Sequence, residues 1–391
     1  MDEHQATGFA ESEEALHEEA SARAGSDDFG QPAYLEGLRV LLDAYDGEAR
    51  FNPTGRENAR RMVRDSLVQR LRCEAQWKQQ PEVLETKIER PIVICGLVRT
   101  GSTALHYLMG QDPTLQVLQY WLAGGPRPRP PRSQWPNEPD FVRARDEIDA
   151  MYAADPGLKA IHFMMPDGPE ECRHLLMQQF TDDSFEANAN VPSYWSWMRQ
   201  ADMLASYQRH RDLLKLIGST ETEKTWLLKY PVHMRFLPTF LEVYPDARVI
   251  LTHRHPLRVL PSYVSLIAGF RALHEDQIDH ADIARRQLDL WADAATDLVA
   301  LRRKKGEAQF YDLHFNDFMA DPIQAVAGIH RHFGRDFSPE SEAALRDWHE
   351  NNPQHKHGRH EYATSPEDVG LSRSEILDRF AEYLEAFNVE D

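Results

Sequence analysis

The spacing of apolar and polar residues divides the chain into a helical beginning and a later part with short buried strands. Tyr34 to Tyr45 and Thr54 to Trp77 carry apolar side chains at helical spacing, and Thr54-x-x-Glu57 has the pattern of a capping box. Pro91 to Cys95 is instead a short continuous apolar run that ends before a glycine, which is typical of a strand buried in a parallel sheet. The pattern therefore predicts a change of architecture near residue 90.

Two further strands are predicted downstream, at Thr225 to Leu228 and at Arg248 to Thr252, and each is followed by a loop and a helical pattern. Strands that alternate with helices predict an α/β fold, with a central parallel sheet and helices on both faces. The intervening stretch, about residues 120–220, has mostly helical patterns, and we expect it to form an insertion that covers the substrate. Ser372 to Phe387 is a further predicted helix, capped by Ser372-x-x-Glu375.

These elements predict two domains. Residues 1–90 form an acidic, helical N-terminal extension to which the sequence assigns no function, and residues 91–391 form an α/β domain with the insertion. The chain has 391 residues, of which 41% are hydrophobic, so it is long enough and apolar enough for a large core.

Charge and cysteine content narrow the classes of partner. A net charge of −19, from 44 basic and 63 acidic residues, disfavours nucleic acid and anionic membranes as partners. No apolar run reaches the roughly 20 residues that a membrane span needs, and the chain begins with acidic residues instead of a signal sequence, so we expect a cytoplasmic protein. Cys73, Cys95 and Cys172 are scattered, which disfavours disulfides and structural zinc.

A glycine-rich loop joins the first predicted strand to a helix that begins near Ala104. Its sequence is Gly96-Leu-Val-Arg-Thr-Gly-Ser-Thr103, and its backbone N–H groups converge with the helix N-terminus on one anion site. The two glycines have Walker A spacing, but Ser102 stands where the Walker lysine belongs and the cation has moved to Arg99. This disfavours an ordinary ATPase, and the alternative of a plain strand–helix turn is less favoured because strand, glycines, hydroxyls and cation occur together.

A second basic loop follows the strand Arg248 to Thr252. It reads His253-Arg-His-Pro256, and Ser262 lies eight residues beyond Arg254. A guanidinium grips a phosphate with two parallel hydrogen bonds, and a serine hydroxyl can donate a further one. By itself such an arginine is more often a surface ion pair. Together with the glycine-rich loop of the same sheet, it predicts a ligand with phosphates at both ends.

At this point the chain resembles the family of sulfotransferases that use 3′-phosphoadenosine-5′-phosphosulfate (PAPS), and in particular its large bacterial branch. Gly96 to Thr103 resembles the family's 5′-phosphosulfate loop, and Arg254 with Ser262 resembles its 3′-phosphate pair in type and spacing. Leu228 to His233 resembles its K-x-P segment, and Lys356 to Arg359 resembles the segment that closes over the nucleotide. The similarity spans nearly the whole chain.

The resemblance implies a P-loop-like sulfotransferase that moves a sulfonate group from PAPS to a hydroxyl or amine of a small-molecule acceptor. The product nucleotide is adenosine 3′,5′-bisphosphate, no metal is expected, and formation of a homo-oligomer stays open. The residues expected to bind the donor are Gly96, Arg99, Thr100, Gly101, Ser102, Thr103, Arg254, Ser262, Lys356, Gly358 and Arg359.

Two cations are candidates for catalysis, because transfer depends on positioning and on charge stabilisation. Arg99 and Lys229 are expected to neutralise the bridging and sulfonate oxygens. For the general base, His162 and His233 lead and Glu170 follows. A purely structural role is possible for these residues as well. His233 can simply pack beside Pro231, and Glu170 can belong to the acidic first turn of a helix.

One position departs from the branch. Members often have a Trp-Glu pair after the phosphate loop, and that glutamate is a plausible base, but here Trp121 is followed by Leu122. This departure keeps open a non-catalytic nucleotide-binding regulator with the same fold. A P-loop phosphotransferase, which requires ATP and magnesium, is a second alternative, and the missing Walker lysine argues against it. A metal site at His355 to His360 is disfavoured, because the cluster lacks ordered acidic or cysteine partners.

Overall fold

Five parallel strands form one sheet in the order β2-β3-β1-β4-β5. They are β1 (Ile92–Gly96), β2 (Leu115–Val117), β3 (Thr225–Lys229), β4 (Arg248–His253) and β5 (Phe310–His314). The central β1 pairs through Val93 with Leu228 on one side and with Val249 on the other. The predicted α/β fold with a parallel sheet is confirmed, and so are the three predicted strands. The sheet also contains β2 and β5, which the sequence pattern did not indicate.

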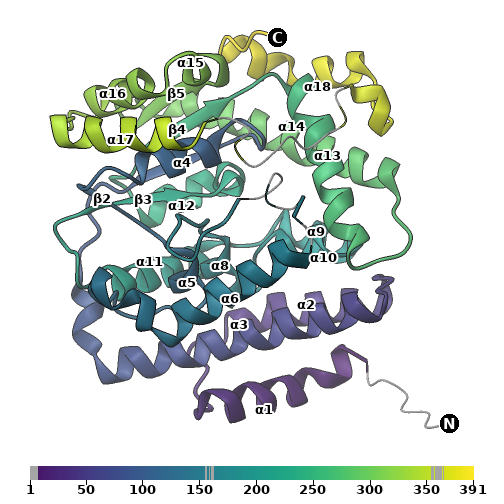
Figure 1. Cartoon of the computed structure of the whole chain (residues 1–391). Coiled ribbons are helices and arrows are strands. Elements are labelled where there is room, and N and C mark those ends of the chain that lie inside the picture. The colour runs from purple at the N-terminus through teal and green to yellow at the C-terminus, as the bar shows by residue number, and fades with distance from the viewer. Residues whose placement is uncertain are drawn as a thin grey trace. The chain divides into compact units, whose positions relative to one another are not determined.

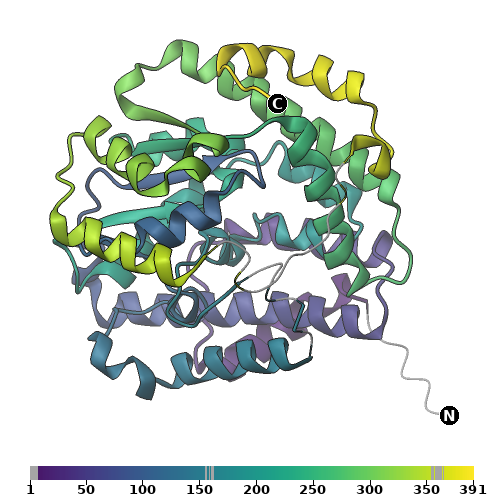
Figure 2. The same cartoon turned by 45° about the horizontal axis from the view of Figure 1, so that its top comes forward.

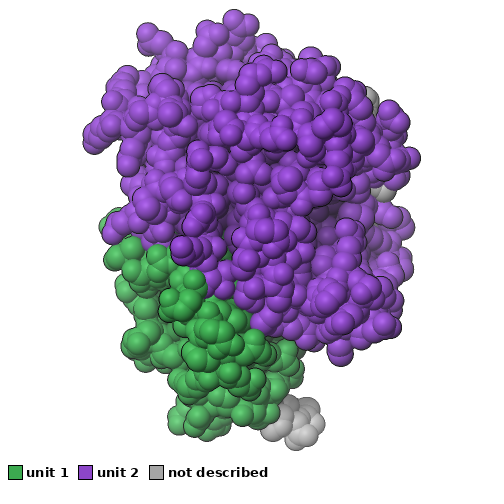
Figure 3. Space-filling model, turned by 90° about the vertical axis from the view of Figure 1, so that its left-hand side faces the viewer, with its two compact units in different colours: residues 1–85, 173–216, 267–279 green, residues 86–172, 217–266, 280–391 purple. Residues whose placement is uncertain are grey.

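The structure is a computed structural model (Figure 1) that describes residues 8–154, 156–157, 159, 163–353, 356, 363 and 365–391. The chain separates into two units, coloured in Figure 3: unit 1 is Met1–Glu85, Arg173–Leu216 and Ile267–Asp279, and unit 2 is Thr86–Cys172, Ile217–Leu266 and His280–Asp391. This grouping assigns part of the predicted insertion to the same unit as the N-terminal segment. Among the described helices, none has the length and apolar character that crossing a bilayer requires.

Unit 1 is helical. Its elements are η1 (Ala10–Ser12), α1 (Glu13–Ala24), α2 (Tyr34–Gly47), α3 (Pro53–Gln79), η2 (Pro81–Glu85), α8 (Arg173–Leu176), η4 (Met177–Gln179), α9 (Ser184–Ala187), α10 (Pro192–Met198) and most of α11 (Leu204–Gly218). The two helices predicted near the N-terminus are thus α2 and α3. The predicted capping box at Thr54 is wrong, because the Asn52 side chain caps α3 by accepting the Gly55 N–H at 2.7 Å. Pro53, whose fixed φ suits a first helical position, starts the helix one residue early.

Unit 2 holds the sheet and the helices that cover it. These are α4 (Ser102–Met109), α5 (Tyr120–Ala123), η3 (Arg132–Asn137), α6 (Pro139–Ala154), η5 (Pro231–Phe236), α12 (Leu237–Val243), most of α13 (Pro256–Ala272), α14 (His280–Lys304), η6 (Glu307–Gln309), α15 (Phe315–Ala320), α16 (Pro322–His332), α17 (Pro339–Asn351), η7 (Pro366–Val369) and α18 (Arg373–Ala386). Residues of α4, α16 and α17 share one core with Ile94 and Ile250 of the sheet, as Figures 1 and 2 allow the reader to follow. The turn η5 packs on β1, and α12 and α14 pack in turn on η5.

The helix α18 is tied to the end of β4. Ser372 caps α18 by accepting the Glu375 N–H at 3.1 Å, as the sequence predicted, and the helix packs along α14. From α18, the Tyr383 hydroxyl lies 2.8 Å from Nδ1 of His253, whose Nε2 lies 2.9 Å from Asp312 of β5. Burial lowers the pKa of His253, so a neutral ring joins the helix to two strands directly before the second basic loop.

Candidate active site

The glycine-rich loop leaves β1 through backbone conformations that favour glycine. Gly96 has φ 140° and lies so close to β4 that a Cβ there would be 2.4 Å from the Thr252 carbonyl oxygen. Gly101, with φ 81°, is the N-cap of α4, and Arg99 also has a positive φ of 59°. The tight turn brings the first N–H groups of α4 over the end of the sheet, where they can bind an anion.

Hydroxyls of the loop have different surroundings. Thr100 is 2% exposed, and its Oγ1 donates to the Leu97 carbonyl at 2.7 Å and lies 2.6 Å from Oγ1 of Thr252. This side chain therefore fixes the loop to β4. Ser102 is buried at the start of α4, whereas Thr103 is exposed on its first turn. Of the three hydroxyls, that of Thr103 is the most accessible to a ligand.

The two basic loops meet. Nε of Arg99 donates to Oγ of Ser262 at 3.1 Å, and Nη1 of Arg254 donates to the Arg99 carbonyl at 3.0 Å. The Arg254 guanidinium also lies 4.1 Å from the centre of the Phe315 ring. Burial lowers the pKa of Arg254, and the charges of Arg99 and Arg258 lower it further. The two positively charged guanidinium groups repel each other, and an anion bound between them would relieve that repulsion.

Lys229 ends β3 beside the first turn of α4. Its Nζ donates to Oγ1 of Thr103 at 3.0 Å and forms an ion pair with Oε1 of Glu171. The lysine side chain is only 3% exposed, while that of Glu171 is 21% exposed. The sequence did not mark Glu171 as a site residue, since a glutamate beside another glutamate has no distinctive pattern.

The predicted general bases lie in different environments. Glu170 is 5% exposed and its backbone N–H donates to the Leu118 carbonyl at 2.7 Å, at the end of β2. His233 is fully buried, with its ring centre 4.9 Å from that of Phe240. His162 lies outside the described residues. Leu122, at the position of the missing glutamate, is buried in α5.

The segment expected to close over the nucleotide lies largely outside the described residues, including Gly358 and Arg359. Lys356 is described; it is exposed, and its Nζ donates to the Asn351 carbonyl at 2.9 Å and to Oδ1 of Asn352 at 3.0 Å. His355, His357 and His360, the histidines of the cluster, likewise fall outside the described part of the chain.

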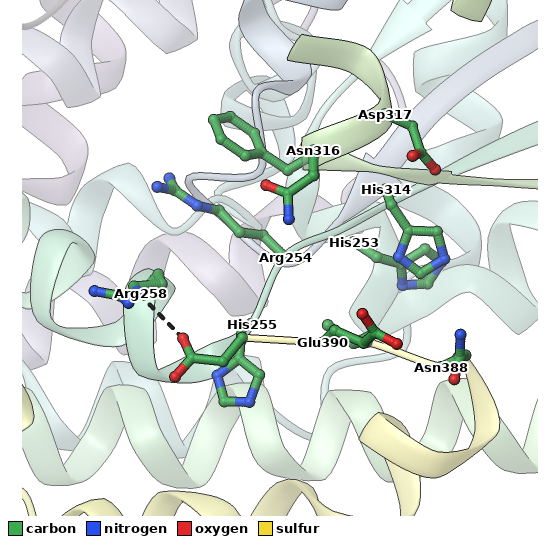
Figure 4. Close-up of a pocket in the computed structure, with 12 residues that line it drawn as sticks. His253, Arg254, His255, Arg258, His314, Asn316, Asp317, Asn388 and Glu390 are labelled. Carbon is green, nitrogen blue, oxygen red and sulfur yellow. Dashed lines mark hydrogen bonds and ion pairs between the residues drawn. The ribbon is translucent and has the colours of Figure 1, made fainter. Parts of the chain in front are cut away.

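A cavity of about 560 Å³ adjoins Arg254 (Figure 4). It is formed by the turns after β4 and β5 and by residues 388–391. Its lining residues are His253, Arg254, His255, Arg258, His314, Phe315, Asn316, Asp317, Asn388, Val389, Glu390 and Asp391. In Figure 4, Asn316 and Glu390 lie on opposite sides of the space. Asp391 pairs with Arg258 at 3.1 Å, so part of the positive charge of this wall is already neutralised.

Comparisons with known proteins agree on one family. A model of the sulfotransferase family matches residues 91–339. The structure of sulfotransferase STF1 from Mycobacterium tuberculosis is 39% identical and superposes with a TM-score of 0.87 over 96% of this chain and 100% of that one. Sulfotransferase STF9 from Mycobacterium avium is 27% identical, with a TM-score of 0.89 over 97% of each chain.

Curated relatives match over a shorter length. The omega-hydroxy-beta-dihydromenaquinone-9 sulfotransferases Stf3 of Mycobacterium bovis and Mycobacterium tuberculosis are each 25% identical over 275 residues, which is 64% of this chain. The chain spans 65% of the length of these curated relatives.

Proposed function

Because the chain belongs to the sulfotransferase family, we propose that it transfers a sulfonate group from PAPS to a hydroxyl of a small-molecule acceptor. The observation that carries this proposal is the junction of the two basic loops, where Arg99 bonds to Ser262 and Arg254 bonds to the Arg99 backbone. A nucleotide with phosphates at its 5′ and 3′ ends requires two anion sites at such close range. A nucleoside triphosphate, which carries its phosphates in one row, does not.

The donor orientation follows from these contacts. The first N–H groups of α4 bind the 5′-phosphosulfate, and Arg254 with Ser262 binds the 3′-phosphate. Ser262 accepts from Arg99, which leaves its hydroxyl hydrogen to donate to a phosphate oxygen. The adjoining cavity of about 560 Å³ is large enough for the adenosine end, and Asn316 offers an amide that can bond to the edge of a base.

The chemistry needs charge stabilisation and in-line positioning. An acceptor oxygen attacks sulfur while the bond from sulfur to the bridging phosphate oxygen breaks. Arg99 belongs to the loop proposed to bind the 5′ end and its side chain contacts Ser262 of the 3′ site, and from between the two sites it stabilises the charge that develops on the bridging oxygen. Lys229, which reaches Thr103 on the first turn of α4, neutralises the sulfonate oxygens.

For the acceptor, we propose a small molecule with an apolar body. The relatives Stf3 are named for omega-hydroxy-beta-dihydromenaquinone-9. Here an aromatic group lies one turn beyond Thr103: the ring centre of Tyr107 is 5.8 Å from that of Phe163 and 5.9 Å from that of Trp348. Burial raises the pKa of Tyr107, and the negative charge of Glu170 raises it further. The carboxylate of Glu170 therefore lies near the Tyr107 ring.

Titration of the chain with adenosine 3′,5′-bisphosphate and with ATP, by calorimetry without metal, tests the donor. We expect the bisphosphate to bind at least about 100-fold more tightly than ATP, because only it engages both anion sites. Tight binding of ATP and none of the bisphosphate would refute the proposal in favour of a phosphotransferase. Incubation with labelled PAPS and a panel of alcohols, phenols and steroids then identifies the acceptor class, and tight bisphosphate binding without any turnover would instead support a non-catalytic regulator.

A further inference from the structure

Lys229 is held by two partners at the position where the donor sulfonate is expected. Its ammonium donates to Oγ1 of Thr103 at 3.0 Å and pairs with Glu171. The lysine is 3% exposed, so its charge depends on a nearby anion for compensation. The carboxylate of Glu171 provides that anion.

A sulfonate group bound at the first turn of α4 competes for the same ammonium. It is an anion with several acceptor oxygens, and it approaches Lys229 from the side of Thr103. Once Lys229 bonds to the sulfonate, its charge is compensated and the ion pair with Glu171 becomes dispensable. Since 21% of the Glu171 side chain is exposed, its carboxylate can turn toward water or toward an acceptor without a burial penalty.

We propose that donor binding exchanges the partner of Lys229 from Glu171 to the sulfonate, and that the released carboxylate of Glu171 is the general base for the acceptor. This inference rests on the proposed function. A carboxylate and a sulfonate that both reach the Lys229 ammonium lie within two hydrogen-bond lengths of each other, at most roughly 6 Å. An attacking hydroxyl beside sulfur therefore falls within its reach.

In the transfer step, each bond that forms is matched by one that breaks. The acceptor oxygen forms a bond to sulfur and gives its proton to the carboxylate of Glu171. The bond between sulfur and the bridging oxygen breaks, and its electron pair stays with the 5′-phosphate of adenosine 3′,5′-bisphosphate. Glu171 later releases the proton to water and returns to Lys229 when the products leave. No oxidant, reductant or metal enters the balance.

The other candidate bases fit the geometry less well. The Oε1 atom of Glu170 accepts the backbone N–H of Glu171 at 2.7 Å, so this carboxylate holds the local backbone of its neighbour. His233 is fully buried, and its ring packs 5.4 Å from that of Tyr230 and 4.9 Å from that of Phe240, in the core below the strand end. Glu171, by contrast, forms an ion pair directly with Lys229.

A matched pair of ligands tests the partner exchange. Calorimetry compares the binding of PAPS and of adenosine 3′,5′-bisphosphate to the wild type and to Glu171→Gln. Because only PAPS carries the sulfonate that competes with Glu171, we expect the substitution to tighten PAPS binding about tenfold and to leave bisphosphate binding within about twofold. Equal changes for both ligands, or weaker PAPS binding, would overturn the exchange.

Single-turnover rates test the base. With bound PAPS, transfer to farnesol is followed, or transfer to water as release of inorganic sulfate when farnesol is not an acceptor. Glu171→Gln should lower the rate about 10²–10⁴-fold, while Glu223→Gln, an exposed carboxylate elsewhere in unit 2, should leave it unchanged. A rate within threefold of wild type, or a larger loss in Glu170→Gln, rules Glu171 out as the base.

A separate measurement shows whether the Glu171 variants fold. Glu171→Gln leaves Lys229 without its carboxylate partner, so thermal unfolding is measured first. If that variant does not fold, Glu171→Asp keeps the charge and withdraws the carboxylate by one methylene group, and we expect it to lose rate but to keep bisphosphate affinity. Wild type that fails to bind bisphosphate refutes the proposed function itself, whereas wild type that binds it while both Glu171 variants turn over normally refutes only this inference.

Discussion

Arg254 is held in place by contacts within the protein. Its guanidinium lies over the Phe315 ring and donates to the Arg99 backbone, so little side-chain freedom remains to be lost when a phosphate binds. We do not expect Arg254 to contribute strongly to the stability of the fold. Its guanidinium is only partly buried, and the aromatic ring beneath it can pack without it.

Arg254→Ala should therefore weaken nucleotide binding and leave the stability of the fold unchanged. We expect the affinity for adenosine 3′,5′-bisphosphate to fall about 100-fold, because a charge-assisted, two-pronged contact with the 3′-phosphate is lost. The thermal midpoint should stay close to that of the wild type. Arg346→Ala is a suitable control, since Arg346 is exposed and pairs with Glu342 within α17. An unchanged affinity in Arg254→Ala means that the 3′ site lies elsewhere.

Among the elements, the strand–loop–helix β1–α4 depends most on backbone geometry. Gly96→Ala places a methyl group against the backbone of β4 at a φ of 140°, so it must either move the strand or open the loop. We expect a loss of at least about 2 kcal/mol in the free energy of unfolding, together with loss of bisphosphate binding. Urea unfolding measures the first and calorimetry the second.

Gly306→Ala provides the comparison for this prediction. A Cβ at Gly306 has no heavy atom within 4 Å, and the residue starts η6 with a negative φ that alanine adopts easily. Its stability should lie within about 0.5 kcal/mol of the wild type. If both glycine variants behave alike, the close approach of β1 and β4 is not what constrains the loop.

The two strands that the sequence did not predict have weak sequence signals. β2 has only three residues, and β5 is an edge strand in which Tyr311, Asp312 and His314 are only partly buried. Neither offers the continuous apolar run that identified β1. The start of α3 was also misjudged, because Thr54 and Asn52 are both good caps and only the backbone path selects between them.

At the scale of the whole molecule, each unit contains a buried neutral histidine. Burial lowers the pKa of His106 in unit 2 and of His210 in unit 1 from 6.5 to about 3. Below pH 6.5 the unfolded chain binds protons that the folded chain does not accept. Stability is therefore fully present above pH 6.5 and falls progressively as the pH drops toward 3.

At pH 5 each histidine should lower the free energy of unfolding by about 2 kcal/mol relative to pH 7.5. Urea unfolding at the two pH values measures the loss, and His106→Gln should reduce it by about that amount, because glutamine does not titrate. The same loss in the variant and in the wild type would mean that His106 is protonated in the folded state.

The sequence by itself determined the fold class, the family and the position of the glycine-rich loop that we propose binds the donor. These rest on local patterns: an apolar run ending at Gly96, a glycine at the N-cap of α4, and an arginine and serine eight residues apart. Local patterns suffice there because backbone conformation, helix termini and strand burial depend on residues close along the chain.

Only the tertiary structure decided which charged and polar side chains come into contact. Arg99 and Ser262 are 163 residues apart, and Lys229 and Glu171 are 58 apart, so no spacing rule connects them. The sequence placed His233 ahead of Glu170 as a candidate base, whereas folding buries the His233 ring in the core and brings the carboxylate of Glu171 to Lys229. Ion pairing and burial are properties of neighbours in space, and the sheet brings these neighbours together from separate strands and loops.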